Sequence, residues 1–408
     1  MIHMYEFIKG GVTAAKGFTA AGVHCGIRKN RTKKDLALIV SDREASAAAV
    51  YTRNLVKGAP LTVTQRHIAD GRARAIVCNS GIANTCAFDG EEKAEGMCAL
   101  AAEALGLSPE DMVVASTGVI GPSISLEPIA AGMPGLAVAL SRDGSADAAE
   151  AIMTTDTRKK EFAVAFELGG KPCILGGIAK GSGMIAPNMA TMLCFLTTDA
   201  AVDSALLHEA LLAVVGDTFN MMTVDGDTST NDMVVLLANG AAGNTPVTEK
   251  NADYAVFVEA LRRMSTALCR SLAADGEGAT KLLECRVTGG KTVEDAKLAA
   301  KAVASSALLK SAMFGADANW GRVLCAIGYS GAAVDVGGVD VAFQSAAGRI
   351  AVCRNGAGIP FSEEEAKRIL SEAEIVIDIS LRDGDAAATA WGCDLTYDYV
   401  KINGDYRT

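Results

Sequence analysis

The order of strand-like and helix-like segments constrains the fold of this chain more than any other feature of its sequence. Short Val- and Ile-rich runs come in neighbouring pairs, such as residues 161–168 and 172–179, which Gly169 and Gly170 separate. Runs that meet at a glycine turn pair as antiparallel strands. Ala-rich amphipathic stretches, such as 204–219, alternate with these pairs. This order argues against a doubly wound parallel sheet and predicts a mixed α/β fold in which helices cover stacked sheets.

The apolar pattern predicts eleven strands, over 35–42, 45–52, 73–80, 161–168, 172–179, 191–199, 232–238, 281–287, 339–344, 349–355 and 374–381. It predicts six helices, over 91–107, 125–140, 204–219, 253–273, 293–314 and 362–373. In the last of these helices, Ser362 is placed to cap the N-terminus, and three glutamates follow it where the helix dipole favours negative charge. The pattern breaks near 185–190 and near 240–248, which are candidate boundaries.

Composition excludes several classes of protein. With 408 residues, of which 50% are hydrophobic and 21% charged, the chain is expected to fold around large cores. Its formal net charge of -10 makes it a poor partner for nucleic acid or an anionic membrane, and no apolar run is long enough for a membrane span. Eleven cysteines without CxxC spacing argue against a disulfide framework or a zinc site. We therefore expect a cytoplasmic protein, since Glu6 and Lys9 also interrupt any signal peptide.

The segment 180–200 is the most informative part of the sequence. Gly181, Gly183 and Ala186 match the GxGxxA form of a dinucleotide fingerprint, which requires a helix to begin there. Pro187 and the strand-like residues after it speak against that interpretation. The chain also has no Walker motif, no GxSxG and no HExxH, and it contains only four histidines. A His-dependent catalytic triad is therefore not expected.

Thr191 is a candidate nucleophile of a different kind. A threonine at the start of a chain can use its own α-amino group as the base for its hydroxyl. The small Ala190 precedes Thr191, and the glycines upstream allow a strained turn. Attack of the hydroxyl on the preceding carbonyl would convert the amide into an ester that water hydrolyses. A threonine that simply opens a buried strand explains the same spacing, and these residues alone leave both interpretations open.

Three further segments have both a functional and a purely structural interpretation. The segment 116–121 can form an oxyanion hole from backbone N–H groups and the Thr117 hydroxyl, or a plain strand-to-helix turn. Glu277, between two glycines, is either a site residue or an exposed loop carboxylate. The acidic segment 223–232 has Thr230 and Leu236 where an EF-hand needs glycine and a carboxylate, so calcium binding is rejected. Cys194 is expected to be a buried, inert thiol.

Six separate segments together resemble the ornithine acetyltransferase family, also called the glutamate N-acetyltransferases. They are STGVIG at 116–121, TTDT at 154–157, KGSGMIAPNMATML at 180–193, FNMMTVDGDTSTND at 219–232, DGEGATK at 275–281 and YVKINGDYRT at 399–408. The resemblance covers essentially the whole chain. It implies an αββα sandwich of the self-processing, N-terminal-nucleophile-like type.

The resemblance also implies how the chain is divided. Cleavage between Ala190 and Thr191 would give an α chain of residues 1–190 and a β chain of residues 191–408 that begins with the nucleophile. The two chains would be interwoven, with a smaller C-terminal subdomain from about residue 245. The expected assembly is an α2β2 heterotetramer.

The functional roles follow from the same resemblance. It implies that Thr191 carries the acetyl group and that Thr117 and Gly118 form the oxyanion hole. It implies substrate contacts from Thr154, Lys180, Thr191, Glu277, Asn403 and Thr408. No metal and no cofactor are expected, although acetyl-CoA is a candidate co-substrate.

The implied reaction transfers acetyl from N-acetylornithine to glutamate in two half-reactions, with ornithine and N-acetylglutamate as products. Two competing interpretations remain. A self-processing aminopeptidase or amidohydrolase would use the same threonine but give the acyl group to water. A binding or scaffold protein would keep an intact chain, with Thr191 as an ordinary strand residue.

Overall fold

The structure, a computed structural model, describes residues 5–186 and 192–405. Nine strands form the first sheet: β1 (Tyr5–Ile8), β2 (Phe18–Val23), β3 (Leu36–Tyr51), β4 (Arg72–Ile82), β5 (Met112–Val119), β6 (Lys160–Leu168), β7 (Lys171–Lys180), β8 (Leu193–Thr198) and β9 (Met233–Ala238). Six strands form the second: β10 (Leu282–Gly290), β11 (Asp340–Ser345), β12 (Gly348–Arg354), β13 (Ala357–Gly358), β14 (Glu374–Ser380) and β15 (Ala386–Cys393).

The helices are α1 (Ala59–His67), α2 (Gly90–Leu105), α3 (Glu127–Val138), α4 (Ser145–Ala151), α5 (Ser204–Asp217), α6 (Ala252–Ala274), α7 (Val293–Ser305), α8 (Ala307–Phe314), α9 (Trp320–Gly328), α10 (Glu363–Leu370) and α11 (Tyr397–Asp405). In the part of the chain that the structure describes, no helix is long and apolar enough to cross a membrane.

The long strand β3 divides the first sheet into two layers. Its first half pairs with β2 and β4, and its second half pairs with β9, which continues through β8, β7 and β6 to β1. The register between β3 and β4 shifts between Val40 and Ala45, at the middle of the strand. The two strands predicted at 35–42 and 45–52 are therefore one strand, shared by both layers.

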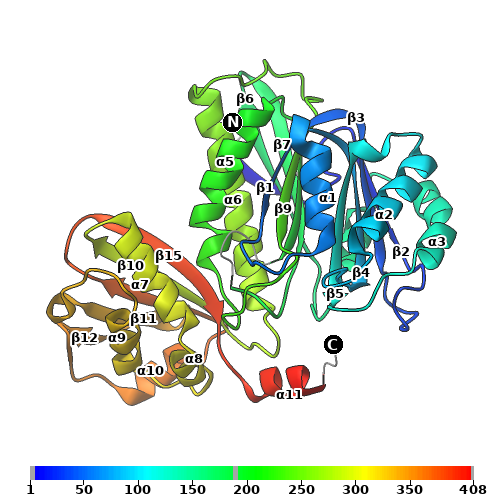
Figure 1. The fold of residues 1–408 in the computed structure, drawn as a ribbon. Helices are drawn as coiled ribbons and strands as arrows, with labels where there is room; N and C mark the ends of the chain where they lie inside the picture. Colours follow the sequence, from blue (N-terminus) through cyan, green and yellow to red (C-terminus); the bar gives the residue numbers. More distant parts are fainter. Residues whose placement is uncertain (1–4, 187–191, 406–408) are drawn as a thin grey trace.

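Alternating side chains show that the two layers face each other. Ile76 of β4 packs in one buried cluster with Phe195 of β8 and Val235 of β9. The next residues along two of these strands point outward: Val77 joins the cluster under α2 and α3, and Leu196 joins the one under α5 and α6. Since side chains alternate between the faces of a strand, the layers follow in the order helix, sheet, sheet, helix, as Figure 1 shows. This is the predicted αββα sandwich.

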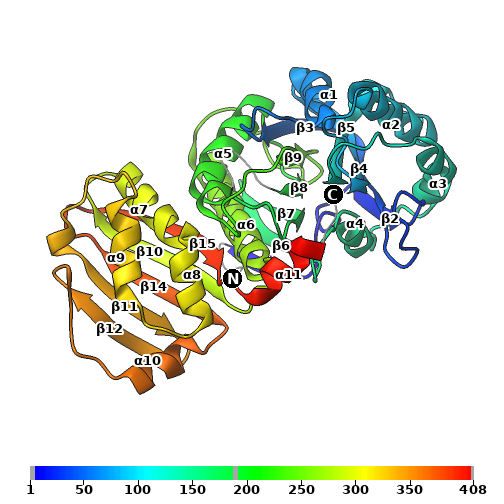
Figure 2. The same cartoon turned by 60° about the horizontal axis from the view of Figure 1, so that its bottom comes forward.

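The second sheet stands beside the sandwich and has the strand order β13-β12-β11-β14-β10-β15. Helix α7 packs against β10 and β15, and α10 packs against β11 and β12 (Figure 2). The first strand of this sheet starts at Leu282, later than residue 245, from which the resemblance implies a smaller subdomain. Helix α6 belongs to the sandwich, since Phe257 lies against Phe166 of β6 with ring centroids 6.3 Å apart.

Candidate active site

A cavity of about 330 Å³ lies where the ends of β5 and β7 meet the loop after α6 and the helix α11. Its lining includes every predicted site residue that the structure describes: Thr117, Gly118, Thr154, Lys180, Glu277 and Asn403. The predicted nucleophile Thr191, the preceding Ala190 and the terminal Thr408 lie outside the described residues. The cavity therefore joins residues from five segments that are far apart in the sequence.

Strand β5 brings Thr117 and Gly118 to the cavity. It runs parallel to β4, with Gly118 opposite Gly81. Gly118 has φ 133°, and a Cβ atom there would overlap the backbone of Gly81 and Ile82. Only glycine fits at this position, so the close approach of the two strands fixes where the Gly118 N–H lies.

Asn231 also holds the ends of β4 and β5 in place through hydrogen bonds. Its amide nitrogen donates to the carbonyl oxygens of Ala83 at 2.6 Å and Ser116 at 3.0 Å. Its amide oxygen accepts from the hydroxyls of Thr85 and Thr230. All the hydrogen-bonding capacity of this side-chain amide is used, which rigidifies the turn that follows β5.

Lys180 ends strand β7 and is buried beside Thr117. Its Nζ atom donates to the Thr117 hydroxyl oxygen at 3.2 Å. Because the oxygen accepts from Lys180, the hydroxyl hydrogen remains free to donate into the cavity. Burial lowers the pKa of the Lys180 ammonium, and the nearby Asp156 opposes that shift. The cation therefore stands in a poorly solvated place where an anionic ligand group would be attracted strongly.

Glu277 is buried and lines the same cavity, so it is not an exposed loop carboxylate. Its backbone N–H donates to the carbonyl of Ser182 at 2.9 Å, and its carboxylate accepts from the Asn403 side-chain amide at 2.7 Å. A Cβ atom on Gly183 would overlap the Glu277 carboxylate, so glycine there makes room for it. Asn403 comes from α11, so this hydrogen bond joins the C-terminal helix to the cavity.

The acidic segment 223–232 contains a turn held by hydrogen bonds to the Asp225 carboxylate. The Asp225 carboxylate accepts from the backbone N–H groups of Met184 at 2.6 Å and Ile185 at 2.8 Å. The turn thus holds the chain just before residues 187–191. Asp232, at the end of the same segment, is buried, and its burial holds the pKa of the carboxyl well above its usual range.

Sequence reasoning missed several of these supporting residues. Asn231 and Asp232 lie within the motif at 219–232, but the sequence alone does not show that they are buried or which groups they contact. Asp156 also lies in a motif, TTDT, whereas Lys160 carries no motif signal at all. Cys194 was predicted correctly as a buried thiol, and burial raises its pKa.

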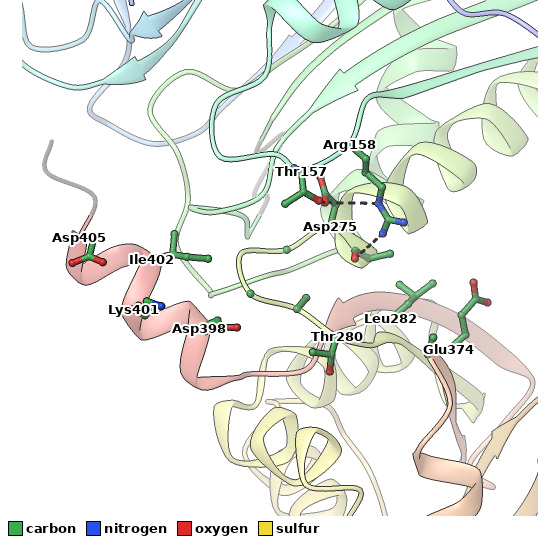
Figure 3. A pocket seen from close by; sticks show the side chains of 15 residues that line it. Thr157, Arg158, Asp275, Thr280, Leu282, Glu374, Asp398, Lys401, Ile402 and Asp405 are labelled. Atoms are coloured by element: carbon green, nitrogen blue, oxygen red, sulfur yellow. Dashed lines mark hydrogen bonds and ion pairs between the residues drawn. The ribbon is translucent and has the colours of Figure 1, made fainter. Parts of the chain in front are cut away.

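A larger cavity of about 770 Å³ lies on the other side of α11. Figure 3 shows Asp398, Lys401 and Asp405 of α11 on one side of it and Arg158, Asp275 and Glu374 on the other. The Arg158 guanidinium donates to the Ala274 carbonyl at 2.8 Å and lies 3.7 Å from the Asp275 carboxylate. Of the predicted site residues that the structure describes, none lines this larger cavity. The smaller cavity is therefore the candidate active site.

Among the described residues, one group has side chains that could ligate a metal together: His67, Glu95 and Cys98. It lies between α1 and α2. The Glu95 carboxylate is already paired with Arg66 and lies 3.1 Å from His67. Burial and nearby Glu95 raise the pKa of Cys98 to about 12, which keeps its thiol protonated. We therefore assign no metal to it.

The layered sandwich, with its cavity at one end of the sheets, defines the chain as an N-terminal-nucleophile-like protein of the αββα class. The model of the ArgJ family matches residues 19–408. The chain belongs to the ArgJ family.

Curated relatives match over almost their whole length. The arginine biosynthesis bifunctional protein ArgJ of Symbiobacterium thermophilum is 54% identical over 405 residues, covering 99% of this chain and 100% of the relative. The protein of the same name from Caldanaerobacter subterraneus is 50% identical over 404 residues, with 99% and 100% covered. The crystal structure of arginine biosynthesis bifunctional protein argJ from Bacillus halodurans is 48% identical, with a TM-score of 0.50, and covers 52% of this chain and 98% of its own.

Proposed function

We propose that this protein is an acyltransferase of arginine biosynthesis, which moves an acetyl group from N-acetylornithine to glutamate. Its family membership and the names of its relatives support this assignment. The observation that supports the chemistry most directly is the single cavity lined by a buried cation, a buried carboxylate and two adjacent candidate oxyanion donors. A second donor, acetyl-CoA, is part of the proposal because the relatives are named bifunctional.

The first half-reaction forms an acetyl ester on Thr191. The Thr191 hydroxyl attacks the acetyl carbonyl while its own α-amino group takes the hydroxyl proton. The Thr117 hydroxyl and the Gly118 N–H donate to the oxyanion of the tetrahedral intermediate. The bond between the carbonyl carbon and the ornithine nitrogen then breaks, and ornithine leaves with the proton on its amine.

The second half-reaction reverses these steps with glutamate. The glutamate amine attacks the acetyl ester, the same donors hold the oxyanion, and the Thr191 hydroxyl leaves with its proton restored. Lys180 pairs with the α-carboxylate of either amino acid. Glu277 pairs with the side-chain amine of ornithine, and Thr154, Asn403 and Thr408 complete the substrate contacts.

The nucleophile is created by cleavage between Ala190 and Thr191, which yields chains 1–190 and 191–408. The matched crystal chain of the relative from Bacillus halodurans supports this part of the proposal, since 98% of it covers only 52% of this protein. We further propose that two such pairs assemble as an α2β2 heterotetramer in the cytoplasm. The eleven unpaired cysteines suit that reducing compartment.

A transfer assay on purified protein tests this function. The parent should form N-acetylglutamate from N-acetylornithine and glutamate with ping-pong kinetics. Thr191→Ala should neither be cleaved nor transfer acetyl, while Thr191→Ser, which keeps a hydroxyl, should retain measurable activity. Acetate released at the same rate with and without glutamate would instead assign the hydrolase function. Parental transfer by Thr191→Ala would contradict the mechanism.

A further inference from the structure

One buried lysine behind the candidate active site joins two aspartates from distant parts of the chain. The Nζ atom of Lys160 lies 2.6 Å from Asp156 Oδ1 and 2.5 Å from Asp275 Oδ2. The exposed fractions of the three side chains are 0% for Lys160, 0% for Asp156 and 3% for Asp275. We call these three residues the Lys160 bridge. None of them lines the candidate active site itself.

Asp156 holds one wall of the cavity. One of its carboxylate oxygens accepts from the backbone N–H of Thr154 at 3.0 Å. The other accepts from the N–H of Gly181, the residue after Lys180, at 2.7 Å. The ionised carboxylate therefore fixes the backbone next to two residues that line the cavity, Thr154 and Lys180.

Asp275 ties down the loop that leads to Glu277. Its carboxylate accepts from the backbone N–H and the hydroxyl of Thr157, and its carbonyl oxygen accepts from the Ser182 hydroxyl at 2.6 Å. Figure 3 shows Thr157 pointing at Asp275. Glu277 is only two residues further along and is itself tied to Ser182. Asp275 and Ser182 together therefore hold the backbone that carries Glu277.

Stability alone does not account for this arrangement. Taking two carboxylates and an ammonium out of water is costly, and apolar side chains of similar volume often stabilise a fold as well or better. What an apolar core would not supply is a specific link, because the ammonium donates hydrogen bonds to two particular carboxylates at once. The bridge links the backbone beside Lys180 to the backbone beside Glu277 through three side chains.

We propose that the Lys160 bridge sets the separation between Lys180 and Glu277, and thereby the length of the amino acid that the cavity accepts. The inference rests on the proposed function, in which these two residues take the carboxylate and the side-chain amine of ornithine. Asp156, Lys160 and Asp275 are positioning residues in this scheme. They act on the substrate only through the backbone segments that carry Lys180 and Glu277.

The test compares three N2-acetylated donors that differ by one methylene each: N-acetyl-2,4-diaminobutyrate, N-acetylornithine and N-acetyl-lysine. The parent should prefer N-acetylornithine. Lys160→Met keeps an unbranched side chain of similar size and removes the charge, so kcat/KM for N-acetylornithine should fall by roughly 100-fold. The preference for N-acetylornithine over the other two should shrink at least about tenfold, since a pocket discriminates one methylene by about 10- to 200-fold. Lys160→Arg, which keeps the positive charge, should have a higher kcat/KM and a stronger preference for N-acetylornithine than Lys160→Met.

Two further variants separate positioning from loss of stability. Lys160→Met/Asp275→Asn removes a carboxylate together with the ammonium, so it should fold more readily than Lys160→Met but stay unselective. Val352→Ala, in β12 of the second sheet, opens a buried position far from the cavity and should keep the parental preference.

A double variant that is folded by circular dichroism and keeps the parental ratio of kcat/KM values would overturn the proposal. The parent's own assay distinguishes that result from failure of the proposed function. If the parent transfers no acetyl from N-acetylornithine, the function is wrong and the inference falls with it.

Discussion

Gly118 combines a conformational and a steric requirement at one point of the candidate active site. Its positive φ and the backbone of Gly81 both exclude a side chain there. Gly121, three residues on, also has a positive φ of 106°, but a Cβ atom there would meet nothing within 4 Å. An alanine at Gly118 would meet both backbone strain and the Gly81 backbone, whereas an alanine at Gly121 would meet backbone strain alone. Comparing the two variants therefore tests the steric overlap separately from the strain.

We predict that Gly118→Ala lowers kcat by at least about 100-fold, because the displaced N–H no longer meets the oxyanion. Gly121→Ala should lose only the roughly 1–2 kcal/mol of stability that a left-handed backbone costs a residue with a side chain. Steady-state kinetics and thermal unfolding of both variants check this. Equal kcat values for the two variants would show that the overlap with Gly81 does not matter.

Asp156 gives stability with a defined pH dependence. Burial on its own would raise the pKa of this carboxyl, but the charges of Lys160 and Lys180 outweigh it and lower the pKa to about 2. Because the folded pKa lies below the unfolded value, the stabilisation is fully present above about pH 5. It is lost as the pH falls through about 2.

We predict that this group contributes about 2 kcal/mol to the free energy of unfolding at neutral pH. Asp156→Asn lacks the titration, so the difference in stability between parent and variant should shrink by about that amount between about pH 5 and pH 2. Urea unfolding at several pH values measures it. A difference that stays constant with pH would mean that the carboxylate is not stabilised by its lysines.

Among the elements of the first sheet, the apolar runs predicted β3, β4 and β6–β9 but not the short strands β1 and β2, which contain few Val and Ile residues. The hairpin of β6 and β7 is confirmed, with Gly169 and Gly170 at φ 54° and 75° in its turn. The cap of α10 is also confirmed, since the Ser362 hydroxyl accepts from the Glu365 N–H. In both cases the signal is local, so one stretch of sequence contains all of it.

Elements whose limits depend on distant contacts were predicted less well. The single helix expected over 293–314 is two helices, because Ser306 leaves the helical conformation and caps α8 with its own hydroxyl. Helix α11 was not predicted, and none of its residues from Tyr397 to Asp405 is buried. Its apolar pattern is correspondingly weak. The site residues could be named from motifs, but Lys160 could not, since its role exists only where the chain brings Asp156 and Asp275 together.

Because α11 buries so little, we predict that the fold tolerates its loss while activity does not. Ending the chain after Thr396 removes Asn403 and Thr408, and Glu277 then loses its partner at 2.7 Å. The melting temperature should change little, whereas kcat/KM for N-acetylornithine should fall by at least about 100-fold. Asn403→Ala in the full chain is the matched control for this single contact. A large drop in melting temperature would show that α11 is a structural element.

On the scale of the whole molecule, cleavage would leave two interwoven chains. Strands β1–β7 precede residue 191 and β8 and β9 follow it, yet β8 pairs with β7 and β9 pairs with β3 within one sheet. Two chains joined in this way should remain together after the Ala190–Thr191 bond is broken. Their separation therefore requires denaturing conditions.

An intact mass spectrum of the denatured protein, before and after brief exposure to N-acetylornithine without glutamate, is the decisive test of the acetyl-threonine mechanism. We expect two fragments that meet at Ala190 and Thr191, with one acetyl group added only to the fragment that starts at Thr191. Adding glutamate should remove that acetyl group. A cleaved protein whose fragments never gain an acetyl group under these conditions would contradict the acetyl-threonine mechanism, and an uncleaved chain that transfers acetyl would contradict the self-processing.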